Sequence, residues 1–236
     1  MTAAAALVVV LVTLAAVNVW VHLAPRRAQL LTGPLAAAFL LAVGRAAGLS
    51  WAELGFGPGW VGRGLWWGGL AAGLVVAGCA AALALPATPR FFRDSRYRLA
   101  ARPALAAAFL AVPLGTVLFE EVAFRGVLWA LLEDAAGTGW AAAGTALLFG
   151  IWHVLPALDL ARTNAAATGA GRGRRRAAVV LGTVAFTAAA GVLCAGLRSG
   201  SDSLLAPALL HWATNAAGVL GSAFVWSLSR EPRPAG

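Results

Sequence analysis

The sequence predicts an all-α protein, a polytopic bundle of about seven transmembrane helices. Of its 236 residues, 61% are hydrophobic and only 11% are charged, whereas soluble domains carry about 25% charged residues. Several apolar runs reach the roughly 20 residues that an α-helix needs to cross the hydrocarbon core. The arginines gather in short stretches between these runs, which is the charge pattern of a membrane protein.

The excess of positive charge points to lipid rather than to nucleic acid. The formal net charge is +9, and every basic residue is an arginine. In a soluble protein this excess would suggest nucleic acid as a partner. Here the arginines flank apolar runs, so we expect anionic lipid headgroups as their partners and no nucleic acid. Cys79 and Cys194 lie in separate apolar runs without a neighbouring His or Cys, so they indicate neither a disulfide framework nor a metal site.

The N-terminal part of the chain contains three apolar segments. No basic residue precedes residues 2–23 and two arginines follow them, so we expect a retained first span and not a signal peptide. His22, at its end, is expected at the interface and outside any site. Residues 28–48 and 64–85 predict the next two spans. Between them, residues 49–63 are rich in Gly, Trp and Phe, which indicates a loop or short helix at headgroup level, an eighth helix being the alternative.

Four further apolar runs complete the seven spans. The first of these four exceeds the length needed to cross a membrane, and Pro113 and Gly115 predict a kink or break within it. The runs are residues 104–132, 140–160, 177–197 and 204–228.

The loops differ sharply in their arginine content. Residues 86–103 and 161–176 hold five arginines each, the stretch after the fourth span holds none, and a short connection holds Arg198 and Asp202. Because basic loops stay in the cytoplasm, we expect the two rich loops and the C-terminus inside and the N-terminus outside a bacterial plasma membrane. We expect one integral membrane domain over residues 1–236, with a motif-bearing core over about 104–228.

The fourth span carries three ionisable residues in its apolar sequence. Such groups are costly in a membrane and usually face a protein interior or a wet cavity. Glu121 and Arg125 are four residues apart, so they share a helix face and can pair. Glu120 has Phe124 at that spacing, so its carboxylate stays available for acid–base work. The alternative is an ion-pair clasp that only holds helices together.

Two later spans also hold polar side chains within apolar sequence. Phe149 and His153 are four residues apart in the fifth span, and His211 and Asn215 are four apart in the seventh. Each pair alone is weak evidence, because an isolated His or Asn can simply bond a neighbouring helix. If the three helices are neighbours, the polar groups of all three can converge on one cavity.

The three motifs together resemble those of the CPBP family of intramembrane proteases. This family includes the type II CAAX prenyl endopeptidases and the Abi proteins of bacteriocin processing and immunity. The matching patterns are E-E-x-x-x-R at 120–125, F-x-x-x-H at 149–153 and H-x-x-x-N at 211–215. They occur in the same order as in the family and cover roughly residues 104–220.

The resemblance implies a role for each of these residues. Glu120 would be the general base that activates water, and His153 would hold and polarise that water. His211 and Asn215 would stabilise the oxyanion formed at the scissile carbonyl. Glu121 and Arg125 would be the supporting pair that positions Glu120, with Phe149 completing the second motif.

A catalytic zinc ion is the competing mechanism. Glu120, His153 and His211 could supply three ligands and leave a fourth position for water, and members of the family are often called metalloproteases. The chain has no H-E-x-x-H motif, and Asn is a poor zinc ligand. We therefore favour a glutamate mechanism without metal or other cofactor.

The expected function is that of an endopeptidase acting on a membrane-associated or prenylated-type peptide or protein. Two other classes of function remain open. One is a membrane immunity or scaffold protein that binds a partner without chemistry, although three intact motifs argue against a lost activity. The other is a proton-coupled transporter using Glu120 and His153, although the chain lacks the internal repeats that transporters often show.

Overall fold

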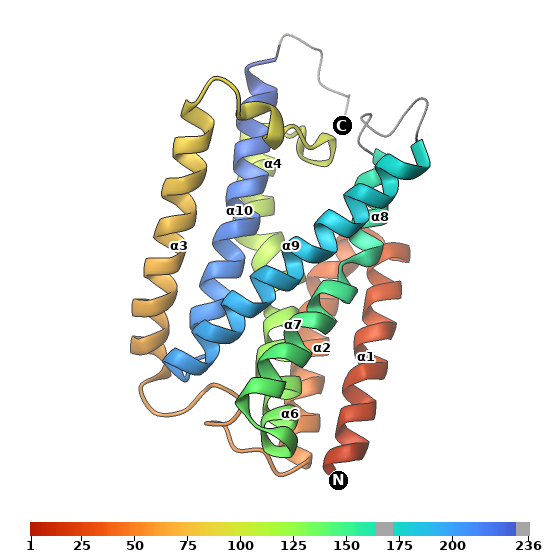
Figure 1. Ribbon diagram of the computed structural model, residues 1–236, viewed down its shortest axis with the longest axis vertical. Helices are drawn as coiled ribbons and strands as arrows, with labels where there is room; N and C mark the ends of the chain where they lie inside the picture. The colour runs from red at the N-terminus through yellow and green to blue at the C-terminus, as the bar shows by residue number, and fades with distance from the viewer. Residues whose placement is uncertain (164–171, 230–236) are drawn as a thin grey trace.

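The computed structural model describes residues 1–163 and 172–229, which form a helical bundle without a β-strand (Figure 1). Six helices of this part are long and apolar enough to cross a membrane, which confirms the predicted fold class. They are α1 (Ala3–Leu23), α3 (Trp60–Ala84), the helix Ala101–Ala136, the pair α7 (Thr138–Trp152) and α8 (Val154–Thr163), α9 (Arg172–Ser201) and α10 (Leu205–Ser227).

The predicted second span is α2 (Arg26–Ala46), whose continuous apolar part is the shorter segment Leu30–Ala46. It packs between α1 and the central helix Ala101–Ala136. A Cβ at Gly33 would collide with the carbonyl oxygen of Leu114, so the absence of a side chain there lets the two backbones approach closely. Residues 49–59 form turns, which agrees with the predicted loop.

The sequence predicted a kink or break at Pro113 and Gly115, and the break does not occur because the central helix Ala101–Ala136 is continuous. Its backbone instead widens into π-helical turns while the helix continues. Proline removes one N–H donor from the regular α-helical pattern, and single π turns inside helices are frequent at functional sites. The consecutive segments are α4 (Ala101–Ala106), η3 (Ala107–Ala111), η4 (Pro113–Val117), α5 (Leu118–Glu121), η5 (Val122–Leu128) and α6 (Trp129–Ala136).

The second half of this helix is enclosed by the other helices. Every residue from Phe119 to Leu131 is buried, including both glutamates and the arginine. Its neighbours are α2, α7 and α10, with α1 and α9 also in contact. The bundle therefore surrounds the charged segment with protein on all sides instead of exposing it to lipid.

Arg198 is a buried helix residue and not a loop residue as the sequence suggested. It lies within α9 with only 4% of its surface exposed. Its Nε donates to the carbonyl oxygen of Arg125 at 3.1 Å, and its Nη2 donates to that of Glu53 at 2.7 Å. Arg198 thus joins the loop after α2 to the central helix.

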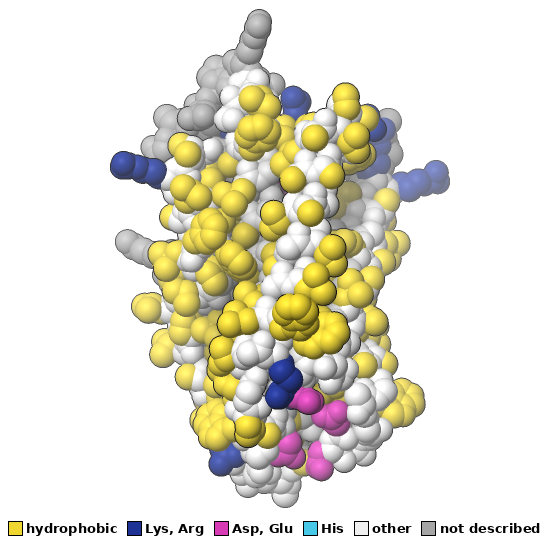
Figure 2. All heavy atoms as spheres, turned by 90° about the vertical axis from the view of Figure 1, so that its left-hand side faces the viewer, with side chains coloured by type: hydrophobic (Ala, Val, Ile, Leu, Met, Phe, Trp, Pro, Cys, Tyr) yellow, Lys and Arg dark blue, Asp and Glu magenta, His cyan; other side chains and the backbone are white. Residues whose placement is uncertain are grey.

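The two arginine-rich stretches lie at the same end of the bundle. Figure 1 shows the α3–α4 connection and the start of α9 at the upper end, opposite the N-terminus and the α2–α3 loop. Figure 2 shows hydrophobic side chains over the middle of the α3 face and acidic ones grouped at its lower end. Leu65, Trp66, Leu70 and Leu74 are among the exposed residues of α3, as expected for a surface in contact with lipid.

This arrangement predicts which loops a membrane-impermeant thiol reagent can reach. In a protein without its native cysteines, Ala87→Cys and Arg174→Cys should resist labelling from outside intact cells, because arginine-rich loops remain in the cytoplasm. Ala135→Cys, at the opposite end, should be labelled and serves as the matched control. Labelling at Ala87 or Arg174 would contradict this orientation.

Candidate active site

Glu121 and Arg125 form the predicted ion pair at the centre of the bundle. Arg125 Nη1 lies 3.0 Å from Glu121 Oε1, and the two side chains are 0% and 1% exposed. The Arg125 guanidinium also stacks over the Phe149 ring, 4.1 Å from its centroid. An aromatic face attracts a cation most strongly when water is excluded. Phe149 therefore stabilises the positive charge of Arg125 together with Glu121.

Glu120 precedes Glu121 on the same helix, about 100° around its axis, and has a partner that its sequence spacing does not reveal. The indole Nε1 of Trp152, on α7, donates to Glu120 Oε1 at 3.0 Å. The second oxygen, Oε2, is 3.8 Å from His211 Nε2 and has no hydrogen-bond partner among the described residues. Trp152 was missed by sequence reasoning, although its place directly before His153 in the second motif was visible.

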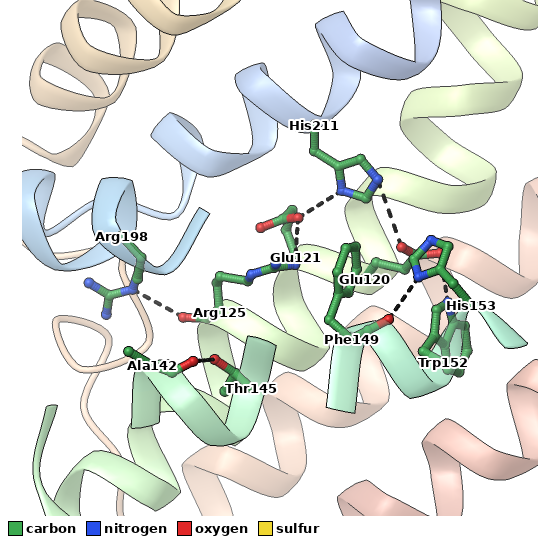
Figure 3. A network of polar contacts seen from close by, with 10 residues as sticks. All are labelled: Glu120, Glu121, Arg125, Ala142, Thr145, Phe149, Trp152, His153, Arg198 and His211. Carbon is green, nitrogen blue, oxygen red and sulfur yellow. Dashed lines mark hydrogen bonds and ion pairs between the residues drawn. The ribbon is translucent and has the colours of Figure 1, made fainter. Parts of the chain in front are cut away.

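His211 lies between the two glutamates (Figure 3). Its Nδ1 is 2.8 Å from Glu121 Oε1, while its Nε2 faces Glu120. A carboxylate can only accept hydrogen bonds, so both contacts are favourable when the imidazole carries both protons. In that form the charges of Glu120, Glu121, Arg125 and His211 sum to zero, which is the favourable balance for a buried cluster.

His153 occupies the junction between α7 and α8, directly after Trp152 ends α7. Its Nδ1 lies 2.8 Å from the carbonyl oxygen of Phe149. Because a carbonyl only accepts, this contact places the hydrogen on Nδ1 and leaves the Nε2 lone pair of the neutral ring free. The His153 ring also packs against Phe149, with centroids 4.6 Å apart.

A cavity of about 890 Å³ brings Glu120, His153 and Asn215 together in its lining. His211 is not part of this lining, but its Nε2 lies 3.8 Å from Oε2 of Glu120, which is. The structure therefore gathers the four predicted catalytic residues in one region, with three on the cavity wall and one buried between the two carboxylates. The predicted supporting residues, Glu121, Arg125 and Phe149, pack directly behind them.

The cavity extends from these residues to the end of the bundle that carries the arginine-rich loops. The α3–α4 connection contributes five lining residues, which are Phe91, Phe92, Asp94, Arg96 and Tyr97. An Asp94–Arg96 ion pair at 2.7 Å holds part of this connection together. If the arginine-rich loops are cytoplasmic, the cavity opens toward the cytoplasm.

The first helix contributes to the cavity, which the sequence analysis did not anticipate. His22, expected at the interface outside the site, lines the cavity together with Asn18. His22 Nε2 lies 3.4 Å from Asp159 Oδ2, and Asn18 Nδ2 donates to the carbonyl oxygen of Trp152 at 2.9 Å. The i, i+4 spacing of Asn18 and His22 in an apolar run was the available signal.

Glu120, His153 and His211 are the three ligands that a catalytic zinc ion would need. Among residues 1–163 and 172–229, no three His, Cys, Asp or Glu side chains are arranged to hold a metal ion. Glu120, His153 and His211 therefore do not form a three-ligand zinc site among these residues.

Residues 102–217 match the family model described as Type II CAAX prenyl endopeptidase Rce1-like. The chain belongs to this family. Comparisons with curated proteins and with solved structures give no match.

The family membership establishes the general activity. The protein is a peptide hydrolase of the CAAX protease type and an integral membrane protein. The matched segment begins at the start of α4 and ends two residues after Asn215, so it contains all seven residues predicted for the site. Asn18 and His22 lie outside it.

Loss of Arg125 should destabilise the fold because Glu121 would lose its buried cationic partner and keep only the contact to His211. We expect Arg125→Ala to lower the free energy of unfolding by ~3–5 kcal/mol, measured by chemical denaturation in detergent. Arg162→Ala removes an ion pair to Asp159 whose side chains are 64% and 43% exposed, and should cost ~0–1 kcal/mol. Equal stability of the two variants would contradict a structural role for the buried pair.

Activity should survive removal of metal ions. Protein purified in the presence of a strong chelator, with zinc content checked by elemental analysis, should cleave a reporter peptide at the rate of untreated protein. Loss of activity on chelation together with recovery on adding one equivalent of zinc would show that a metal mechanism operates.

Proposed function

We propose that the protein is an intramembrane endopeptidase in which Glu120 activates water for attack on a peptide bond of a membrane-associated substrate. The observation that carries this proposal is the position of Glu120, which is 6% exposed, in the wall of a cavity that His153 and Asn215 also line. Its Oε2 atom has no hydrogen-bond donor in the described part of the protein and can accept a proton.

The proposed reaction begins with a water molecule between Glu120 and His153. His153 Nε2 accepts a hydrogen bond from this water and orients it, while Glu120 removes a proton as the water oxygen attacks the scissile carbonyl carbon. The carbonyl π electrons move to its oxygen. Glu120 then gives the proton to the amide nitrogen, the C–N bond breaks, and the products are a carboxylic acid and an amine.

Asn215 and His211 are proposed to stabilise the oxyanion of the tetrahedral intermediate. The Asn215 amide can donate from the cavity wall, and His211 can donate from Nε2 when that nitrogen carries a hydrogen. Such donors are effective because they are already oriented in a site with little water. The Glu121–Arg125 pair keeps His211 in place through the 2.8 Å contact to its Nδ1.

The proposed substrate carries a hydrophobic anchor of the prenyl type. A second cavity of about 220 Å³ adjoins the first and shares five lining residues with it, Arg96, Tyr97, Val112, Gly115 and Thr116. Its other walls are mostly apolar and include Leu30, Leu99, Ala107 and Ala111. We propose that the anchor lies there while the peptide reaches Glu120 from the cytoplasmic face of a bacterial plasma membrane.

Three substitutions test this division of roles. Glu120→Gln keeps size but removes the base, so it should abolish turnover of an internally quenched, farnesylated CAAX peptide in liposomes while leaving binding intact. Asn215→Ala removes one oxyanion donor and should lower the rate about 10²–10³-fold. Asn215→Asp should be worse, because an ionised carboxylate would face the developing negative charge.

Glu133→Gln is the matched control for these variants. Glu133 is also bonded to a tryptophan, Trp129, but does not line either cavity. Its loss should leave turnover unchanged. Near-normal turnover in Glu120→Gln would show that Glu120 is not the base.

A further inference from the structure

Trp152 contacts the carboxylate of Glu120 on the side away from His211. Its Nε1 donates to Oε1 at 3.0 Å, and its side chain is nearly buried, with 8% of the residue exposed (Figure 3). A hydrogen bond to a charged acceptor is stronger than one between neutral groups. The contact therefore fixes one of the two Glu120 oxygens.

Trp152 is held by two other parts of the bundle. Its ring packs against Phe119 at 5.8 Å and Phe124 at 5.9 Å between centroids, both on the central helix. The backbone carbonyl of Trp152 accepts a hydrogen bond from Asn18 Nδ2 of α1 at 2.9 Å. With ring and backbone both fixed, the N–H points at Glu120 without freedom to turn away.

This restraint makes the two oxygens of Glu120 different, because only one of them accepts a hydrogen bond. The terminal torsion of a glutamate side chain is broad and roughly two-fold, so an unrestrained carboxylate would present either oxygen. Here Oε1 is occupied by the indole, and Oε2 faces His211 Nε2 at 3.8 Å without a hydrogen-bond partner among the described residues. Oε1 already accepts one hydrogen bond, so Oε2 is the oxygen with both lone pairs free to accept a proton.

We propose that Trp152 is a positioning residue for the catalytic base, whose indole N–H holds Oε1 of Glu120 so that Oε2 receives the proton. The inference rests on the proposed role of Glu120 as the general base. It extends the site to Trp152, which occupies an unspecified position of the F-x-x-x-H motif. It also gives α1 a function, because Asn18 holds Trp152 from outside the family-matched segment.

The test is Trp152→Phe in the full-length protein, which removes the N–H and keeps an aromatic ring. Cleavage of the farnesylated, internally quenched CAAX peptide in liposomes should show kcat lowered about 10- to 100-fold, the scale of a lost hydrogen bond to a charged group. KM should stay within about twofold, because the substrate-contacting groups are unchanged. A purely structural role would lower the amount of folded protein without this split between kcat and KM.

The protein contains a matched control for this substitution. Trp129, 1% exposed, donates its Nε1 to Glu133 Oε2 at 2.9 Å, which is the same tryptophan–carboxylate contact away from the cavity. Trp129→Phe should therefore lower the melting temperature about as much as Trp152→Phe while keeping kcat. An equal loss of kcat in both variants, or a kcat within twofold of wild type in Trp152→Phe, would overturn the proposal.

A second variant decides the case if Trp152→Phe does not fold. Asn18→Ala leaves the indole in place but removes the bond to the Trp152 carbonyl, so we expect a several-fold fall in kcat with little change in KM, and an unchanged kcat would overturn the proposal. Glu120→Gln distinguishes a failure of the proposed function from a failure of the positioning role. If Glu120→Gln is active, the proposed function fails, whereas an inactive Glu120→Gln beside a fully active Trp152→Phe refutes only the positioning role.

Discussion

The ion pair between Glu121 and Arg125 is the constraint on which the rest of the structure depends. Two charges with at most 1% of their side chains exposed are costly to bury, and they persist only where other groups complete their environment. Phe149 covers the guanidinium, His211 bonds the carboxylate, and Arg198 bonds the Arg125 carbonyl from α9. Three helices besides the central one are therefore held in position by this pair.

The same constraint explains why the catalytic groups lie inside the bundle. The outer faces of the helices are apolar, and lipid offers no partner to a polar side chain. The polar groups must turn inward, where Glu120, His153 and Asn215 meet in one cavity. The cavity extends from these groups to the arginine-rich end of the bundle.

The helices that precede the family-matched segment also shape the site. Asn18 and His22 from α1 line the main cavity, and Leu30 from α2 lines the smaller one. Neither helix carries one of the three motifs, and both lie outside residues 102–217. The three motifs and part of the cavity wall thus come from different parts of the chain.

The sequence by itself determined the fold class, the approximate spans and the three motifs. These follow from local properties, namely apolar run length and the i, i+4 spacing that places Glu121 beside Arg125 on one helix face. The tertiary structure alone decided the contacts between helices, because residue spacing along one helix cannot specify which side chain of another helix lies opposite. It paired Glu120 with Trp152, placed His211 between two carboxylates and buried Arg198 within α9. It also kept the central helix continuous through Pro113, since π turns within a packed bundle can absorb a residue that would interrupt a regular α-helix.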